Sequence, residues 1–293
     1  MDNASRWAQL ESDGYTVIPG VVDPIEIDKA LRVINRSLGK HTPIRENMCP
    51  GCGGMKEITD LLSKSALKGI LETLIGPFSG GGGGQIALRF PGDNAGPNFE
   101  VYPGWENHWH IDGLSTPDST QNSIPSGDIH NFTALVGVLL QDVPEENMGN
   151  LVLYPGSHLE LQEHFKSVGF SEVLTHGTKA LPKLNFARAP VQIRGKAGDA
   201  IIVNYLTAHL VAPNLSSSIR YCIYFRLKGQ CFEQGNRRAL KHRPESMLDA
   251  WLDWPRLAKA NRERIQAAAN TNVYESSEDE ELRRALAQST IEY

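Results

Sequence analysis

The chain has 293 residues, of which 40% are hydrophobic and 22% are charged, with a formal net charge of −5 and a pI of about 6.0. This is the composition of an ordinary globular protein, long enough for one large domain or two small ones. The mild acidity speaks against a nucleic-acid partner, and no stretch reaches the ~20 apolar residues of a membrane span. Because the polar N-terminus also lacks an apolar signal core, we expect a cytoplasmic protein.

The N-terminal part of the chain predicts one strand and one well-marked helix. Residues 13–22, "DGYTVIPGVV", alternate between apolar and polar residues and are bounded by Gly and Pro, which predicts a strand. Asp23 is a good N-cap, and Pro24 suits the first helical position. Gly39 ends the segment, so a helix is predicted between these signals.

Residues 40–56 indicate an irregular loop, and residues 56–76 have the pattern of one further helix, ending at Gly76. The glycine run at 79–85 has no Gly-Lys-Ser/Thr ending, so we interpret it as a flexible connector and not as a phosphate-binding loop.

The four cysteines do not indicate a disulfide framework. Cys49 and Cys52 form a C-x-x-C pair, whereas Cys222 and Cys231 are distant and not so paired. A zinc site would need two more ligands, and a redox pair would need a thioredoxin-like context that is absent. We interpret the pair as part of a Gly/Pro-rich turn, with a metal or redox role as the alternative.

From residue 85 to residue 228 the chain consists of short apolar runs separated by turn residues, which predicts an all-β sandwich or barrel. The predicted strands are "QIALRF", "NFEVYP", "HWHID", "NFTALVGVLLQDV", "GNLVLYPG", "VQIRG", "DAIIVNYLTAHL" and "IRYCIYFRL". Residues 229–293 predict a C-terminal helical tail. Without a repeat or a convincing linker, we expect a single domain over residues 1–293, with 1–84 as its N-terminal strand and helices.

A candidate metal site begins with His110 and Asp112, which are separated by one residue and would share a face of a strand. His209 follows a buried apolar run far downstream, and Arg220 comes eleven residues later. Two His and one Asp form the facial triad of non-haem Fe(II) sites. An arginine beside such a site suits the carboxylate of a cosubstrate, with a structural ion pair as the alternative. His108 is two residues before His110 and would lie on the same face of a strand, so it is the alternative first ligand.

Together these segments resemble the phytanoyl-CoA dioxygenase-like family of the Fe(II)/2-oxoglutarate-dependent dioxygenase superfamily. Four segments carry the resemblance in the family's order: "DGYTVIPGVVDPIEIDKAL", "HWHID", "LLQDVPEENMGNLVLYPGSH" and "GDAIIVNYLTAHLVAPNLSSSIRY". The fold that the resemblance implies is mainly β with flanking helices around a double-stranded β-helix, a cupin-like jelly-roll.

The resemblance also implies roles for individual residues. The Fe(II) ligands would be His110, Asp112 and His209, which form the catalytic centre. Arg220 would bind the distal carboxylate of 2-oxoglutarate. Asn107 matches a position at which relatives often place an amide that touches the cosubstrate, and Gln85 and Arg89 are further candidates for this contact.

Two positions depart from the family pattern. Gly137 stands where the family often has an aromatic residue, so the pocket would be larger or the cosubstrate packed differently. Met148 is inserted where the family runs directly from Asn to Gly. Neither change removes a ligand.

Aromatic residues and histidines around the motif have simpler interpretations. Trp109 is expected to pack into the opposite face of the sheet. Trp105 and Tyr102 would line a substrate entrance or pack within their loop. His158 is interpreted as a loop residue at the mouth of the site, and residues 251–255, "WLDWP", as a helix docked on the core.

The implied activity is that of an oxidoreductase that uses Fe(II), O2 and 2-oxoglutarate, with ascorbate as an assay additive. It would oxidise, and most often hydroxylate, a C–H bond of a small organic, lipid-like or secondary-metabolite substrate, releasing succinate and CO2. Loops at 40–56, 113–130 and 158–190 would form the lid. The alternatives are a non-catalytic cupin-like binding protein and a triad metalloenzyme that does not use 2-oxoglutarate. The sequence specifies neither the substrate nor the oligomeric state.

Overall fold

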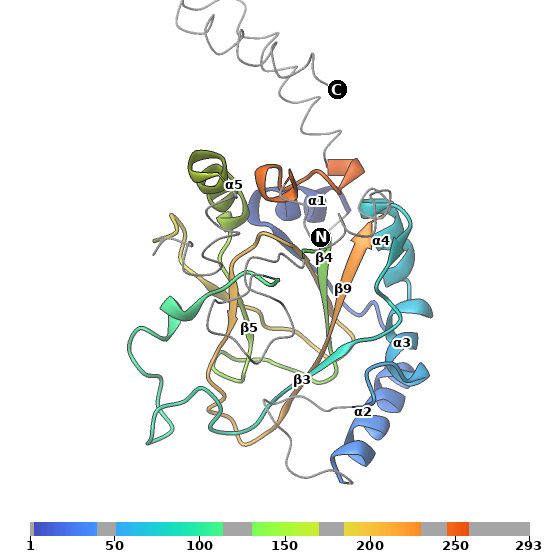
Figure 1. Ribbon diagram of the computed structural model, residues 1–293. Coiled ribbons are helices and arrows are strands. Elements are labelled where there is room, and N and C mark those ends of the chain that lie inside the picture. Colours follow the sequence, from blue (N-terminus) through green and yellow to red (C-terminus); the bar gives the residue numbers. More distant parts are fainter. Residues whose placement is uncertain (1–2, 40–50, 114–130, 170–184, 230–244, 258–293) are drawn as a thin grey trace, which may run out of the picture.

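The computed structural model describes residues 3–39, 51–113, 131–169, 185–229 and 245–257, and its strands form two antiparallel sheets (Figure 1). The larger sheet has the order β1-β7-β4-β9-β2, with β3 also paired to β9, and the smaller has the order β6-β5-β8. The larger sheet contains β1 (Tyr15–Ile18), β2 (Phe78–Ser79), β3 (Gln85–Arg89), β4 (Ala134–Leu139), β7 (Ala200–Asn204) and β9 (Arg220–Gly229). The smaller sheet contains β5 (Leu151–Leu153), β6 (Val191–Gln192) and β8 (His209–Val211). The predicted mainly-β jelly-roll is confirmed.

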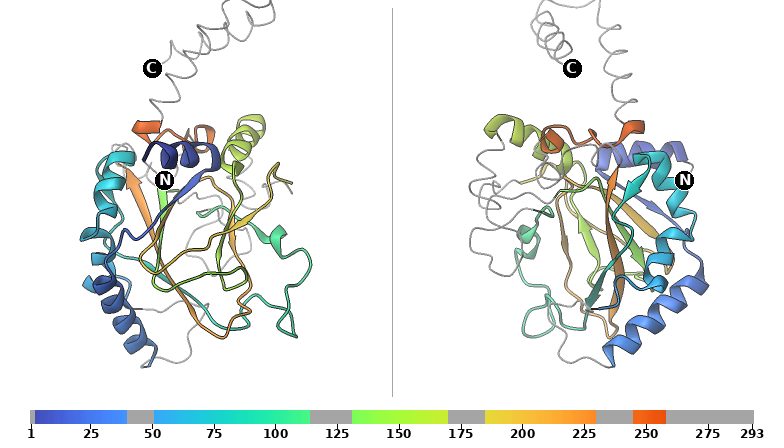
Figure 2. Two further views of the ribbon diagram at one scale, coloured as in Figure 1. Left: turned by 180° about the vertical axis from the view of Figure 1, so that it is seen from behind. Right: turned by 45° about the vertical axis from the view of Figure 1, so that its right-hand side comes forward.

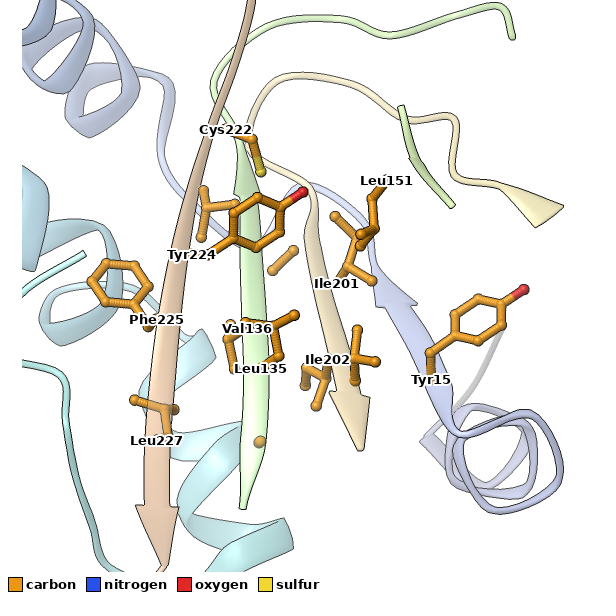
Figure 3. Packing of buried hydrophobic residues seen from close by; sticks show 14 of the residues in the cluster. Tyr15, Leu135, Val136, Leu151, Ile201, Ile202, Cys222, Tyr224, Phe225 and Leu227 are labelled. Atoms are coloured by element: carbon orange, nitrogen blue, oxygen red, sulfur yellow. The ribbon is translucent and has the colours of Figure 1, made fainter. Parts of the chain in front are cut away.

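The larger sheet is buried on both faces. Every residue of β4 and β7 is buried, which explains why these strands read as continuous apolar runs and not as alternating ones. Figure 3 shows Cys222 and Tyr224 on one side of β9 and Phe225 on the other. On the outer side, α2 (Pro24–Leu38), α3 (Lys56–Ser63) and α4 (Leu67–Ile75) lie along the sheet (Figures 1 and 2).

The helix predicted from the Asp23 signal is confirmed as α2. The Asp23 side chain accepts a hydrogen bond from the backbone N–H of Ile25 at 2.7 Å, Pro24 begins the helix and Gly39 caps its end. The buried residues Ile27, Ala30 and Ile34 are spaced three and four apart, so one face of the helix packs on the core.

The single helix predicted at residues 56–76 is wrong, because α3 and α4 are separate. The hydroxyl of Ser65 donates to the backbone carbonyl of Leu61 at 2.8 Å. This hydrogen bond from the serine hydroxyl competes with the backbone N–H groups that would otherwise bond to the helical carbonyls and continue the helix. The break lets both short helices bury their apolar faces, and Gly76, with φ of +72°, ends α4.

The glycine run predicted to be a flexible connector is a closely packed turn between β2 and β3. A Cβ atom on Gly80 would collide with the backbone oxygen of Arg226, and one on Gly84 would collide with the side chain of Ile223. The backbone N–H of Gly84 also donates to Gly53 at 2.9 Å. Glycine is therefore required here by close contact with β9.

Two helices were not predicted, namely α1 (Asn3–Asp13) and α5 (Ser157–Val168). Helix α5 replaces the first part of the lid loop expected at 158–190. It starts after Gly156, whose φ of +83° few other residues adopt, and it buries Leu161 and Phe165 at helical spacing. The predicted strand "NFEVYP" is also wrong, because this segment forms turns and Phe99 has a φ of +56°.

Several predictions lie outside the described residues, wholly or in part: Cys49, Cys231, most of the loops at 40–56 and 113–130, and the tail beyond residue 257. Of the predicted C-terminal helices, α8 (Glu245–Leu248) is described. In the "WLDWP" segment, residues 251–253 form a turn and Pro255 is helical, with Trp251 and Trp254 buried. Within the described ranges, no helix has the length and apolar character needed to cross a bilayer.

Candidate metal centre

The candidate metal centre is built around one backbone bridge between two distant segments. His110 and His209 form an isolated antiparallel pair, in which each backbone N–H donates to the other's carbonyl at 2.9 Å. Directly opposed residues in an antiparallel pair place their side chains on the same face. The two imidazole rings consequently lie 4.5 Å apart between centroids.

Asp112 completes the cluster. Its Oδ1 atom lies 3.7 Å from Nε2 of His110 and 3.7 Å from Nε2 of His209. One ligand atom from each of these three residues falls within 4.8 Å of the others, the only such group of His, Cys, Asp or Glu in the described ranges. Two imidazoles and one carboxylate on one side of an ion are the donor set of a non-haem Fe(II) site.

The predicted strand "HWHID" is only partly correct. Residues 105–108 form a 3₁₀ turn, and only His110 pairs with a strand, at the end of β8. The expectation that residues i and i+2 reach one ion nevertheless holds, because Asp112 lies beside His110. The local cause is extended backbone after the turn, fixed by a single bridge and not by a full strand.

The tautomer of His209 suits metal binding. Its Nδ1 lies 2.9 Å from the backbone oxygen of Thr207, so Nδ1 carries the proton and donates it to this carbonyl. The lone pair is therefore on Nε2, the atom that faces Asp112. A backbone acceptor on the far nitrogen commonly orients metal-binding histidines.

Asp112 is held by an arginine that sequence reasoning missed. Arg226, on β9, donates from Nε and Nη2 to Oδ2 of Asp112 at 2.9 and 2.6 Å. Burial alone would raise the pKa of Asp112, but contact with His209 and the charge of Arg226 outweigh it and hold that pKa well below its usual range. The carboxylate is therefore ionised at neutral pH. The sequence did contain a signal for this contact: Arg226 is a second arginine on the predicted strand, an even number of residues from Arg220, and therefore lies on the same face of that strand.

Arg220 has the surroundings of an anion-binding group. Its side chain is 1% exposed, and Nε donates to the backbone oxygen of Gly149 at 2.7 Å while Nη1 donates to that of Ala87 at 3.2 Å. Nη2 is buried, and no protein atom of the described residues accepts its protons. These contacts involve carbonyls and no carboxylate, so they do not support the alternative of a structural ion pair.

A second guanidinium, half-buried, lies next to Arg220. Arg89 on β3 is its direct cross-strand partner, so both side chains leave the sheet on the same face. Nη1 of Arg89 donates to the carbonyl of Leu88 at 2.7 Å, and Nε is buried without a partner in the described part of the chain. Burial and the neighbouring Arg220 lower the pKa of Arg89.

The other candidates near the triad lie differently. His108 is exposed on the 3₁₀ turn and packs against the Tyr102 ring at 6.2 Å, so the structure brings His110, and not His108, to Asp112 and His209. Asn107 is exposed on the same turn, with its backbone N–H donating to Gly104. Its contact with a cosubstrate stays a prediction.

Aromatic residues pack beside the metal centre. The Trp109 ring contacts Phe186 at 4.7 Å, and Phe186 contacts Tyr154 on the segment after β5 at 5.1 Å. The hydroxyl of Tyr154 donates to the backbone oxygen of Glu106. Trp105 is buried, which favours loop packing over the alternative of an entrance lining. These contacts hold the 3₁₀ turn against the smaller sheet and so fix where the triad segment starts.

His158 was expected in a loop at the mouth of the site, but it lies fully buried at the start of α5. Its Nε2 is 3.1 Å from the backbone oxygen of Glu11, and its ring contacts the Trp251 ring at 5.2 Å. His158 therefore joins α1, α5 and the C-terminal segment and has no contact with the triad among the described residues.

The metal centre falls inside a recognised family region. Residues 93–222 match the model of the phytanoyl-CoA dioxygenase (PhyH) family. No curated protein matches the sequence at a significant level.

Solved structures with similar folds include SnoN, HygX and AviO1. SnoN, the non-haem alpha-ketoglutarate-dependent epimerase of nogalamycin biosynthesis, is 20% identical, with 78% of this chain and 82% of SnoN covered and a TM-score of 0.48. HygX from Streptomyces hygroscopicus, solved with nickel and 2-oxoglutarate bound, is 13% identical, with 78% and 88% covered and a TM-score of 0.48. AviO1 from Streptomyces viridochromogenes Tue57 is 18% identical, with 78% and 96% covered and a TM-score of 0.46.

The matched region contains His110, Asp112, His209 and Arg220 together, in the order and spacing on which the sequence resemblance rested. The candidate metal centre therefore lies within residues 93–222, the stretch that is similar to the phytanoyl-CoA dioxygenase family.

Proposed function

We propose that this chain is an Fe(II)- and 2-oxoglutarate-dependent dioxygenase that oxidises a C–H bond of a small organic substrate. In the balanced reaction, 2-oxoglutarate, O2 and the substrate give succinate, CO2 and a hydroxylated product. A bound ferrous ion would supply the activation of O2, and the protein would supply the binding geometry. We further propose that residues 1–293 form one catalytic domain, because β1 of the N-terminal part pairs with β7 of the core.

One observation carries this proposal. The triad His110, Asp112 and His209 gathers three ligand atoms within 4.8 Å of one another, while the bond to Thr207 uses the far nitrogen of His209 and both Arg226 bonds use the other oxygen of Asp112. A facial set of three protein ligands leaves three positions of an octahedral ion open. This number is enough for a chelating 2-oxo acid and O2 together.

The surroundings of Arg220 support 2-oxoglutarate as the cosubstrate. A buried guanidinium with an unpartnered Nη2 is costly unless an anion fills the site. Arg220 and Arg226 leave the same face of β9, with Cys222 and Tyr224 between them. A five-carbon dicarboxylate that runs from the triad toward Arg220 would therefore lie across these two side chains and be shielded from water.

The arginines also separate this proposal from its rivals. A cupin-like binding protein would not need an ionised carboxylate beside two imidazoles, and a triad enzyme without 2-oxoglutarate would not need a buried cation at Arg220. The substrate remains a small organic, lipid-like or secondary-metabolite molecule.

The experiment is succinate release from 2-oxoglutarate by the purified chain with Fe(II), O2 and ascorbate, followed by mass spectrometry. We expect wild-type turnover above the protein-free background, loss in His110→Ala, and a raised requirement for 2-oxoglutarate in Arg220→Ala. His108→Ala is the matched control, because His108 is two residues away and exposed. Absence of both succinate release and 2-oxoglutarate binding in the wild type would refute the proposal.

A further inference from the structure

Arg226 makes an unusual set of contacts with the candidate metal ligand Asp112. Both of its bonds to the carboxylate, from Nε at 2.9 Å and Nη2 at 2.6 Å, go to the same oxygen, Oδ2. Oδ1 points the other way and is equidistant, at 3.7 Å, from Nε2 of His110 and of His209. The two oxygens of Asp112 thus face different groups: Oδ2 accepts from Arg226, and Oδ1 lies toward the two histidines.

The position of Arg226 is itself fixed on several sides. Its Nη1 donates to Oε1 of Gln85 on β3 at 2.6 Å. Its guanidinium carbon lies 5.8 Å from the centre of the Phe132 ring, within the range of a cation–π contact. The planar guanidinium uses all three nitrogens, two on the ligand and one on the sheet, so it cannot rotate without losing a bond.

We propose that Arg226 is a positioning residue that makes Asp112 a one-oxygen ligand through Oδ1. The inference rests on the proposed function, because it concerns how the same centre holds its metal. A carboxylate free to turn can bind a metal through both oxygens and would then occupy two coordination positions. By holding Oδ2, Arg226 keeps that second position open for the cosubstrate or O2.

The positive charge of Arg226 opposes binding of a metal ion, whereas its orientation of Asp112 favours it. Two variants separate these effects. Arg226→Lys keeps the positive charge but has a single donor nitrogen and no planar fork. Arg226→Gln loses the charge, which by itself would favour a nearby cation. If positioning is the role, the lysine variant is impaired although its charge is intact. If charge alone matters, it behaves as wild type.

The test is titration of the metal-free proteins with Ni(II) alone, by calorimetry, together with crystal structures of the Ni(II) forms. Loss of a group that orients a metal ligand commonly costs 10- to 100-fold in metal affinity. We expect Arg226→Lys to bind Ni(II) 10- to 100-fold more weakly than wild type, and Arg226→Gln to be less impaired than Arg226→Lys. In the wild-type structure Oδ1 alone should contact the ion, with Oδ2 still on Arg226.

Arg32→Gln is the control, because it removes a guanidinium that pairs with Asp28 on the exposed side of α2 and does not touch Asp112, and it should bind Ni(II) as wild type does. Unchanged thermal unfolding of the metal-free variants excludes misfolding, and the wild-type crystal structure tests the inference even if a variant fails to fold. Wild-type affinity in Arg226→Lys, or a two-oxygen Asp112 ligand in the wild type, would overturn the inference alone. Failure of the wild type to bind Ni(II) would overturn the proposed function as well.

Discussion

Gly137 and Tyr224 are direct cross-strand partners on β4 and β9, and the Tyr224 ring fills the space that a side chain at residue 137 would need. A Cβ atom at 137 would lie 2.9 Å from Cε1 of Tyr224, closer than packed carbons approach. The sequence had suggested either that the missing side chain enlarges the pocket or that the cosubstrate packs differently there. The Tyr224 ring, which is labelled in Figure 3, occupies the space beside Gly137, so the pocket is not enlarged at this point.

This relationship predicts the effect of Gly137→Ala. The added methyl group displaces the Tyr224 ring, and such overpacking costs about 1–3 kcal/mol of unfolding free energy. Urea denaturation measures the loss. The double variant Gly137→Ala/Tyr224→Leu should regain part of that stability relative to Tyr224→Leu alone. Equal stability of wild type and Gly137→Ala would show that the ring does not fill this space.

Arg220→Lys tests the proposed clamp on the distal carboxylate. Lysine keeps a charge but loses the planar fork, so we expect the KM for 2-oxoglutarate to rise about 10- to 100-fold, the cost of losing one hydrogen bond to a charged group. Steady-state succinate formation at saturating Fe(II) measures this value. The same variant should bind Ni(II) normally. An unchanged KM would instead assign Arg220 a purely structural role.

Arg89→Met should affect stability and cosubstrate binding in opposite directions. Without an anion, the two neighbouring guanidiniums repel each other; partial burial, and after it this repulsion, lower the pKa of Arg89. Removing one cation should raise the thermal midpoint of the metal-free protein and weaken 2-oxoglutarate binding. Thermal scans with and without 2-oxoglutarate compare the two effects. If both fell together, Arg89 would be a packing residue only.

His158 predicts an acid-sensitive contribution to stability. Burial lowers its pKa to about 4, against 6.5 for the unperturbed group, although the Glu11 carbonyl and Asp13 oppose the shift. Between these pH values the unfolded chain binds the proton and the folded chain does not, so stability falls as pH drops from 6.5 to 4. The full effect is about 3 kcal/mol.

The measurement is urea unfolding of wild type and His158→Gln between pH 7 and pH 4.5. Glutamine keeps a donor for the Glu11 carbonyl but does not titrate in this range. We expect the wild type to lose more stability than the variant on acidification. If the unfolding free energies of wild type and variant changed in parallel with pH, His158 would make no acid-sensitive contribution to stability.

The sequence predicted the parts of the fold that depend on local signals. The cap at Asp23 and the apolar runs of β4, β7 and β9 appear as expected, because caps and continuous burial leave a direct trace in residue type. The break between α3 and α4 was missed because it depends on how Ser65 uses one carbonyl. Helix α5 was missed because its start depends on the backbone at Gly156.

The same division applies to the metal centre. His110, Asp112 and His209 were predicted from spacing and residue type, and Arg89 was named as a candidate cosubstrate contact, whereas the contact of Arg226 with Asp112 was missed. The contacts of these two arginines are set by the register of β3, β4 and β9, and no local pattern encodes that register. The roles of His158 and Tyr224 likewise emerge only when segments distant along the chain are brought together.

The most direct measurement of the central claim is metal binding by the triad. Calorimetric titration of metal-free protein with Ni(II) should give one site per chain in the wild type and in His108→Ala. Each of His110→Ala, Asp112→Ala and His209→Ala should lose that site while the protein remains folded. Retained one-to-one binding in the three triad variants, or its loss in His108→Ala with His110→Ala unaffected, would contradict the account.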